Sequence, residues 1–346
     1  MSNTACIITI DAEGDDLWGR PREITTLNAG YLPRFQALCE RFRFKPVYLT
    51  NHEMAASPAF VEFGRDVIAR GAGEIGMHLH AWNSPPLYSL TNDDFRYQPY
   101  LIEYPDRVMK EKIKTHTGFL EDQFDQKMFS HRAGRWAFDG RYAAMLIEEG
   151  YRVDCSVTPG VDWRRSRGAP HGNGGSNYRN FPSRPYFFNP SDISSPASGG
   201  LLEVPVTICP STFYRRVPLA YRIRLVRRFA NKASPGLRWL CPGQSDLESM
   251  LRAAAEARAQ GADHVEFMLH SSELMPGGSQ NFRDAAAIER LYEDLEILFE
   301  DLSAWSTGMT LKEFHTCFEK APDRPAQTSQ DAGHPGHVVN IEMART

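Results

Sequence analysis

The sequence predicts an α/β fold with a mostly parallel sheet, because short apolar, β-branched segments alternate with segments of helical periodicity along most of the chain. About seven segments of the first kind occur, and this number favours closure of the sheet into a barrel. The chain has 346 residues, of which 42% are hydrophobic and 24% charged. These values are typical of globular proteins and predict a sizeable core.

The expected elements follow one another in a regular order. Strands are expected at "CIITID" (6–11), "PVYLT" (46–50), "EIGMHLH" (74–80), "KMFSHRA" (127–133), "RVDCSVT" (152–158), "LLEVPVTI" (201–208) and "VEFMLH" (265–270). Helices are expected at 31–42, 60–71, 105–124, 138–150, 246–260 and 284–304. Together they predict one domain over residues 1–320.

Three segments interrupt this alternation. Residues 164–200 are rich in Gly, Pro, Ser and Asn without helical periodicity, which is typical of a functional loop such as a lid or a substrate loop. Residues 215–238 are strongly basic, and residues 321–346 form a polar tail that we expect to be disordered.

The basic segment 215–238 has two interpretations. It contains no acidic residue, and apolar residues recur in it at helical spacing, which predicts an amphipathic helix. Its charges either form a solvated face above a packed apolar face, or bind an anionic substrate or membrane surface, such as a sugar on a polyprenyl phosphate.

Composition also indicates the surroundings of the protein. The six cysteines are scattered without a CxxC pair, as expected for buried free thiols in a reducing compartment. The sequence has no membrane-spanning apolar run and starts without the features of a signal peptide, so we expect a cytoplasmic protein. The net charge of -4 gives no general attraction to nucleic acid.

Polar residues stand where the predicted strands end. In parallel α/β folds the carboxyl ends of the strands gather at one side, where reacting groups collect. The residues at or just after these ends are Asp11, Glu13, Asp15, Asp16, His78, His80, Arg132, Asp162, Trp163 and His270.

This set suits metal-assisted hydrolysis of an amide or ester. A carboxylate with two imidazoles is a common ligand set for a catalytic divalent metal, which activates water near neutral pH. A second carboxylate can accept the proton of that water, and a protonated histidine can supply one to the leaving group. An arginine can keep the second carboxylate ionised and oriented.

The motifs resemble those of the polysaccharide deacetylase (NodB-homology) family, carbohydrate esterase family 4. "TIDAEGDD", "EIGMHLH", "SHRAGRW", "VDW" (161–163) and "FMLHSSEL" are similar to its five motifs in order and spacing, from about residue 5 to 318. The resemblance implies a distorted (β/α) barrel and a hydrolase that removes acetyl or similar acyl groups from a carbohydrate or glycan precursor. Lipid-linked and nucleotide-linked sugars are both candidate substrates.

The resemblance also implies residue roles. Asp11 would be the general base and His270 the general acid, oriented by Arg132 and Asp162 respectively. Trp163, Trp82 and Arg135 would bind substrate.

The implied metal site departs from the family pattern at two positions. Ala12 stands where the usual metal aspartate follows the base, so Glu13 takes that place. Trp82 stands where the second histidine of His-x-x-x-His would be, so His80 joins His78 as a ligand. Zn²⁺ is the first choice of metal, with Co²⁺, Ni²⁺ or Mn²⁺ as alternatives.

Other interpretations remain open at this stage. The two histidines could bond only to backbone, "DAEGDD" could be an acidic turn, His270 could cap a turn and Arg132 could be a structural ion-pair member. The rival functions are a non-sugar amidohydrolase or deformylase on the same fold, and a sugar-binding homologue without catalysis. His52 and His131 are expected to be structural.

Overall fold

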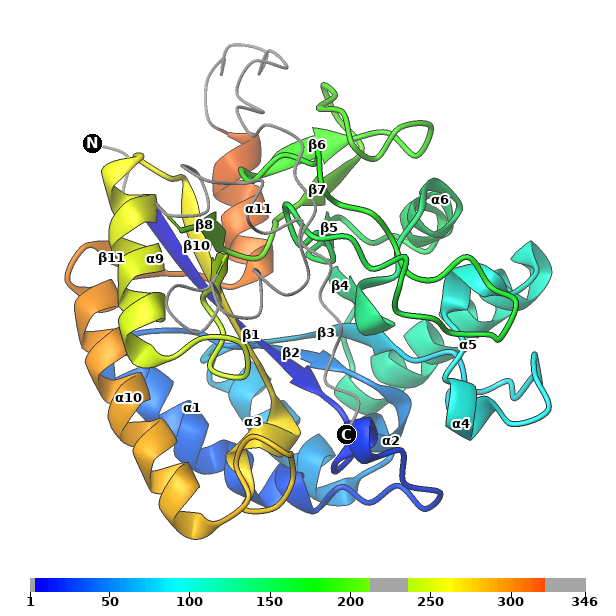
Figure 1. The fold of residues 1–346 in the computed structure, drawn as a ribbon, viewed down its shortest axis with the longest axis horizontal. Helices are drawn as coiled ribbons and strands as arrows, with labels where there is room; N and C mark the ends of the chain where they lie inside the picture. Colours follow the sequence, from blue (N-terminus) through cyan, green and yellow to red (C-terminus); the bar gives the residue numbers. More distant parts are fainter. Residues whose placement is uncertain (1–3, 212–235, 321–346) are drawn as a thin grey trace.

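A computed structural model describes residues 4–211 and 236–320 of the chain (Figure 1). Its main sheet has nine strands in the order β10-β1-β2-β3-β4-β5-β7-β6, and β11 pairs with β1 in addition. The strands of this sheet are β1 (Thr4–Ala12), β2 (Val47–Thr50), β3 (Glu74–Leu79), β4 (Ser130–Ala133), β5 (Val153–Asp154), β6 (Tyr186–Phe188), β7 (Leu201–Glu203), β10 (His264–His270) and β11 (Ser306–Gly308). A separate two-stranded sheet pairs β8 (Ile208–Pro210) with β9 (Leu237–Trp239).

The sheet is parallel along the whole path from β10 to β7, and only β6 runs antiparallel to its neighbour. Irregular backbone joins the two sides: Thr207 N donates to Glu266 O (3.4 Å), Leu240 N to Thr207 O (3.0 Å) and Met268 N to Leu240 O (3.1 Å). Seven parallel strands and this irregular seam form a distorted (β/α) barrel. The predicted fold class is confirmed.

Helices follow most of the strands and cover the outside of the sheet (Figure 1). They are α1 (Leu32–Arg41), α2 (His52–Ala55), α3 (Pro58–Ala69), α4 (Asp94–Tyr97), α5 (Asp106–Phe124), α6 (Gly140–Glu148), α9 (Leu247–Ala259), α10 (Ala285–Ser303) and α11 (Leu311–Glu319). Several begin at a side-chain cap, as the sequence signals predict: Asp139, Asp246 and Asp284 each accept a hydrogen bond from a backbone N–H in the first turn.

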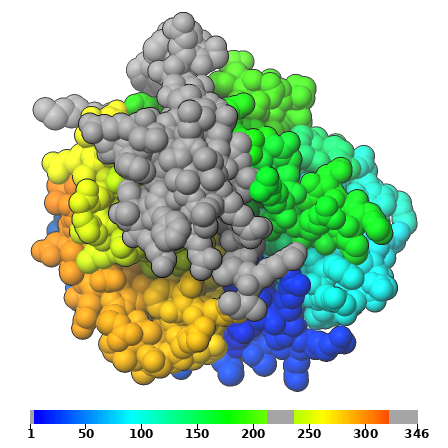
Figure 2. Space-filling model, in the orientation of Figure 1, coloured from blue at the N-terminus to red at the C-terminus, as the bar shows by residue number. Residues whose placement is uncertain are grey.

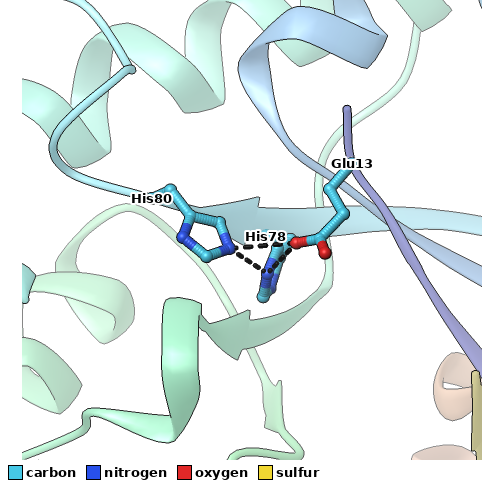
Figure 3. Close-up of side chains that lie close together, drawn as sticks. All are labelled: Glu13, His78 and His80. Atoms are coloured by element: carbon cyan, nitrogen blue, oxygen red, sulfur yellow. Dashed lines mark hydrogen bonds and ion pairs between the residues drawn. The ribbon is translucent and has the colours of Figure 1, made fainter. Parts of the chain in front are cut away.

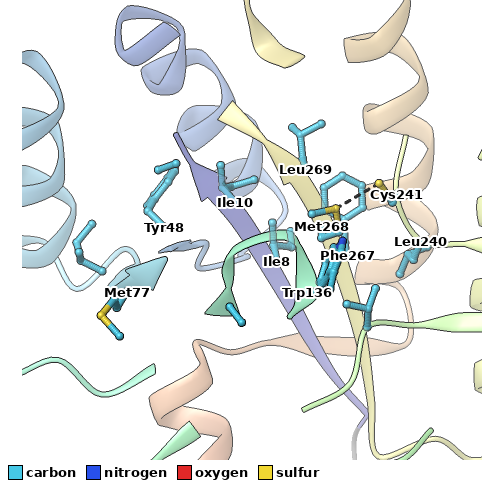
Figure 4. Packing of buried hydrophobic residues seen from close by; sticks show 14 of the residues in the cluster. Ile8, Ile10, Tyr48, Met77, Trp136, Leu240, Cys241, Phe267, Met268 and Leu269 are labelled. Carbon is cyan, nitrogen blue, oxygen red and sulfur yellow. Dashed lines mark hydrogen bonds between the residues drawn. The ribbon is translucent and has the colours of Figure 1, made fainter. Parts of the chain in front are cut away.

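The two faces of the strands differ in chemistry. Along β1, Ile8 and Ile10 point toward the helices and belong to a large apolar cluster, part of which Figure 4 shows with Tyr48, Met77 and Phe267. The alternate residues of β1 face the barrel interior, since successive side chains of a strand point to opposite faces.

The interior changes in character along the barrel. Near the amino ends of the strands it is apolar, with Ala5, Ile7, Val47 and Leu49 packed against α11. Toward the carboxyl ends the same face carries Thr9 and Asp11. The barrel therefore has a dry apolar end and a polar end.

The structure also departs from the expected elements. The segment "LLEVPVTI" divides into β7 and β8, because Pro205 has no N–H for a ladder hydrogen bond. The irregular segment 164–200 contributes β6. The short elements α2, α4, β9 and β11 are too brief for a periodic signal and were not predicted, and α11 follows the last expected helix.

Two predictions fall on residues that are not described. The proposed amphipathic helix in 215–238 lies outside the described residues except for 236–238, and the tail 321–346 lies outside them entirely. Within the described ranges, no helix is both long and apolar enough to cross a membrane.

Helix α10 offers a direct test of the packing. Leu298 is fully buried in the large cluster, whereas its neighbour Ile297 is 49% exposed. We expect Leu298→Ala to lower the free energy of unfolding by about 2–5 kcal/mol, because it removes buried contacts and leaves a cavity. Ile297→Ala is the matched control and should cost under about 1 kcal/mol. Urea unfolding measures both values, and equal losses would contradict the packing of α10.

Candidate active site

The polar end of the barrel gathers side chains from four strands. Asp11 of β1 lies in register with His270 of β10, and His78 of β3 lies in register with Arg132 of β4. Residues in register on parallel strands point to the same face, so all four project into the barrel at its carboxyl end. The structure thus brings together residues more than 250 positions apart in the chain.

Glu13, His78 and His80 form a compact cluster at this end (Figure 3). The Nε2 atoms of the two histidines lie 3.0 Å apart, and Glu13 Oε2 lies 3.1 Å from His80 Nε2 and 3.6 Å from His78 Nε2. All three residues are buried. Three different ligand atoms therefore converge on one point, although His78 and His80 are only two residues apart.

The surroundings of the cluster leave its ligand atoms free to bind a cation. His78 Nδ1 lies 3.0 Å from the carbonyl oxygen of Arg132, which can only accept, so in the neutral imidazole Nδ1 carries the proton and Nε2 the lone pair. Glu13 Oε1 is buried and has no hydrogen-bond partner among the residues that the structure describes. Ligands of a tetrahedral zinc ion lie about 3.3 Å apart, as its bond lengths of roughly 2.0–2.1 Å require. The cluster fits a divalent cation.

The charges of the three residues affect one another. Burial would lower the pKa of His78, but Asp11 and Glu13 raise it above its ordinary value. Burial would raise the pKa of Glu13, but hydrogen bonds from His78 and His80 outweigh burial and hold the pKa below its ordinary value. Burial lowers the pKa of His80, which favours the neutral imidazole that a metal requires.

Arg132 binds two carboxylates at once. Its guanidinium donates to Asp11 Oδ1 (2.6 Å) and to Glu266, and also to Thr9 Oγ1 (2.8 Å). Burial would raise the pKa of Asp11, yet the charge of Arg132, with His78 and His270, holds it below its ordinary value. Asp11 is therefore ionised, with Oδ2 turned toward His78 (3.9 Å) and His270 (4.0 Å).

His270 stands on the opposite side of Asp11 from the cluster. Burial alone would lower its pKa, but the hydrogen bond to Glu273 (Nδ1 to Oε2, 3.2 Å) and the charge of Glu13 raise it to about 9. Trp18 packs edge-on against its ring, with centroids 5.7 Å apart. His270 is protonated at neutral pH in this setting.

Two of the residues expected in the site lie elsewhere. Asp162 forms ion pairs with Arg164 (2.9 Å) and Arg179 (2.6 Å), while the carboxylate at Nδ1 of His270 is that of Glu273. The expectation that Asp162 orients His270 is wrong for this structure, because the two neighbouring arginines hold the carboxylate away.

Trp163 does not line the pocket beside the cluster, as described below. Its indole donates to Thr158 Oγ1 (2.8 Å), its ring packs against Trp239, and it is 4% exposed. The structure therefore gives Trp163 a packing role and does not place it at the cluster.

Trp82 and Arg135 do lie beside the cluster. They line a small pocket together with Glu13, His80, Leu17, Trp18 and Gln98.

The acidic residue Asp15, which follows β1, has a structural role. Its carboxylate accepts hydrogen bonds from Thr25, Leu27 and Asn28 and orders the following loop. His131 bonds to Asp154 and Tyr142, away from the cluster.

Sequence reasoning missed Glu266 and Glu273. Glu266 lies four residues before His270 on the same strand. Because side chains alternate along a strand, both residues point into the barrel, and this direction could be predicted from the sequence. Glu273 follows His270 by three residues in a 3-10 turn, where its side chain also accepts from His270 N (3.0 Å). A turn of that length gives no periodic signal.

Comparison with known proteins adds information at the level of the fold. Neither protein-family models nor curated proteins match this sequence. Among solved structures, a Mycobacterium smegmatis protein assigned as a polysaccharide deacetylase superposes with a TM-score of 0.51 at 15% identity, over 94% of this chain and 96% of its own. The chain has the fold of the polysaccharide deacetylases.

Two further structures show how widely this deacetylase fold is used. A Parabacteroides distasonis protein assigned as a glycoside hydrolase/deacetylase superposes with a TM-score of 0.58 at 10% identity, over 92% of this chain and 72% of its own. The 4-alpha-glucanotransferase of Thermococcus litoralis gives 0.53 at 13% identity over 93% of this chain, which spans 41% of that enzyme. A deacetylase-type barrel thus carries more than one chemistry, and the site must decide the function.

Removal of Arg132 should expose how much the site depends on it. We expect Arg132→Met to lower the free energy of unfolding at pH 7 by about 3–5 kcal/mol, because two buried carboxylates lose their counter-ion. The difference in unfolding free energy between the variant and the wild type should become smaller at acid pH. The pKa of Asp11 is lower in the folded than in the unfolded protein, so its ionisation stabilises the wild type above the unfolded-state pKa. This stabilisation is lost as the pH falls through the folded-state pKa.

Urea unfolding at several pH values measures this effect. Arg141→Met, which breaks exposed ion pairs with Asp106 and Asp139 and an exposed hydrogen bond to Ile102 O, is the control and should cost under about 1 kcal/mol. A similar loss for both variants would contradict the account of Arg132.

The His270–Glu273 contact gives a second prediction. Glu273→Gln keeps the size of the side chain but removes its charge, so the pKa of His270 should fall from its raised value of about 9. NMR titration of the His270 ring in chelator-treated protein measures the shift. Glu289→Gln, at an exposed pair with Arg34, should leave the titration unchanged.

Proposed function

We propose that this protein is a metal-dependent hydrolase that removes an acetyl or similar acyl group from a carbohydrate or glycan precursor. The observation that carries the proposal is the placement of the Glu13–His78–His80 cluster beside an ionised carboxylate and a protonated histidine. The deacetylase fold supports it.

Glu13, His78 and His80 would hold the divalent cation, with zinc as the first choice for a site of two imidazoles and one carboxylate. The bound cation would polarise the acyl carbonyl and make a water molecule acidic enough to attack at neutral pH.

The remaining steps belong to the side chains of the chain itself. Asp11 Oδ2 is the free oxygen of a carboxylate held by Arg132, so it accepts the proton of the attacking water. His270 Nε2, on the other side of Asp11, donates a proton to the departing amine or alcohol. Glu273 fixes the His270 ring through Nδ1, in the role first expected of Asp162.

The candidate acyl and sugar site is the surface at the small pocket beside the cluster, because the pocket itself has room only for a group the size of a water molecule. Trp82 and Trp18 line it, and indole rings are well suited to pack against a sugar face. We include in this proposal that the sugar is lipid-linked or nucleotide-linked. We also include contact of residues 215–238 with an anionic surface.

A cytoplasmic location is proposed on the state of the cysteines. All six are free thiols, and five are buried, with Cys317 exposed. Free thiols persist most readily in a reducing compartment.

Asp11→Asn tests the catalytic proposal. It should lower turnover of acetylated sugars by about a thousandfold, because the attacking water loses its proton acceptor. Zinc content should stay near that of the wild type, since Asp11 is not a ligand. His78→Ala is the contrasting variant and should lose both zinc and turnover.

Metal analysis of protein purified without chelators and a screen of acetylated sugars, nucleotide sugars and lipid-linked sugars provide the measurements. Full activity of Asp11→Asn would refute the base assignment. Absence of metal and turnover in the wild type would favour the sugar-binding alternative.

A further inference from the structure

Arg135 is a buried arginine that forms no ion pair among the described residues. It is 9% exposed, its guanidinium donates to the backbone carbonyls of Gln98 and Arg167 (3.1 Å for the latter), and it lies over the Tyr100 ring, 4.3 Å from the centroid. Among the described residues, no acidic group lies within 4.0 Å of it. Arg132, by contrast, is neutralised by two carboxylates at the same end of the barrel.

An unneutralised buried cation is costly, because it has left water without gaining an opposite charge. Burial lowers the pKa of Arg135 below its ordinary value, as expected for such a group. Arginine nevertheless stays charged, so the positive charge persists in the pocket.

Two unused donors belong to the lining of this pocket. Arg135 Nε and Trp82 Nε1 are both buried without a hydrogen-bond partner among the described residues. Both residues line the pocket that adjoins Glu13 and His80, and the pocket has room for about one water molecule or a group of that size. Orphaned donors of this kind call for an acceptor from outside the chain.

The backbone around Arg135 is held in an unusual conformation. Arg135 and Trp136 have φ values of 54° and 62°, in the left-handed region that non-glycine residues rarely adopt. Gly134 makes this turn possible, because a Cβ there would strike the carbonyl of Leu79. Strain of this type is typical of positions where a side chain must be directed into a site.

We propose that Arg135 and Trp82 bind one oxygen of a substrate carboxylate, next to the acyl group that is cleaved. This inference rests on the proposed function, which makes the pocket part of a hydrolase active site. It narrows the substrate to an acylated molecule that carries a carboxylate, such as an acylated uronic acid. A guanidinium and an indole N–H can together donate to one oxygen of a carboxylate.

Binding tests the inference without any turnover. In chelator-treated full-length protein, acetate should shift the NMR signals of the Arg135 Nε–H and Trp82 Nε1–H groups, while acetamide and sodium chloride at equal concentration should not. Arg135→Gln should abolish the shift at Trp82. No acetate shift at concentrations up to about 0.1 M, the range of a weak charge-assisted contact, overturns the proposal.

Kinetics extend the test to substrate. The wild type should favour the 6-carboxylate of methyl N-acetylglucosaminide over the neutral glycoside by about tenfold in kcat/KM, and Arg135→Gln should bring this ratio near one. The 6-phosphate serves as the alternative anion, and a preference for it without one for the carboxylate overturns the assignment.

Two further variants keep the result clear. Trp82→Phe keeps the aromatic packing and removes only the N–H, so it should reduce the carboxylate preference even if Arg135→Gln fails to fold. Arg107→Gln, at an exposed position of α5, should leave the ratio unchanged. Anion binding without turnover of either glycoside refutes the proposed function alone, whereas turnover without anion preference refutes this inference alone.

Discussion

The polar end of the barrel depends on the buried guanidinium of Arg132. It reaches from β4 across the interior to β1 and β10, where it donates to Asp11, Thr9 and Glu266. Its Nε also donates to the carbonyl of Cys155 (3.0 Å), so each of the three nitrogens donates at least one hydrogen bond. A charge buried to this degree is tolerated only with such complete pairing, and this fixes Asp11 in position and charge. The backbone carbonyl of the same residue sets the tautomer of His78.

Much of this arrangement was predictable, because the alternation of side chains along a strand tells which face of the sheet each residue points to. Asp11, His78, Arg132 and His270 each end an apolar strand, and alternation sends all four to the face opposite the helices. Seen from outside, the segments that follow β1 and β10 adjoin at the rim of the barrel (Figure 2), where Asp16 N donates to Gly278 O (3.0 Å). Parallel topology alone predicts that meeting.

The failures have an equally physical origin. The pairing of Asp162 with His270 was inferred from a family resemblance, but two arginines close in sequence to Asp162 compete for its charge. The Trp163 indole donates a hydrogen bond to Thr158 in the interior, and no pattern in the sequence predicts this contact. Glu273 acts through a short turn. Within the described part of the chain Arg135 forms no ion pair, and this depends on three-dimensional surroundings that the order of residues does not reveal.

The seam of the barrel also bears on how His270 is held. β8 and β9 pair beside the seam, and Ser211 N donates to Gly236 O (2.9 Å). Thr207 directly precedes β8 and Leu240 directly follows β9, and the backbone groups of these two residues join the two sides of the barrel. Leu240 O accepts from Met268 N, two residues before His270, so a change that disturbs β8 or β9 would reach the end of β10 through the backbone.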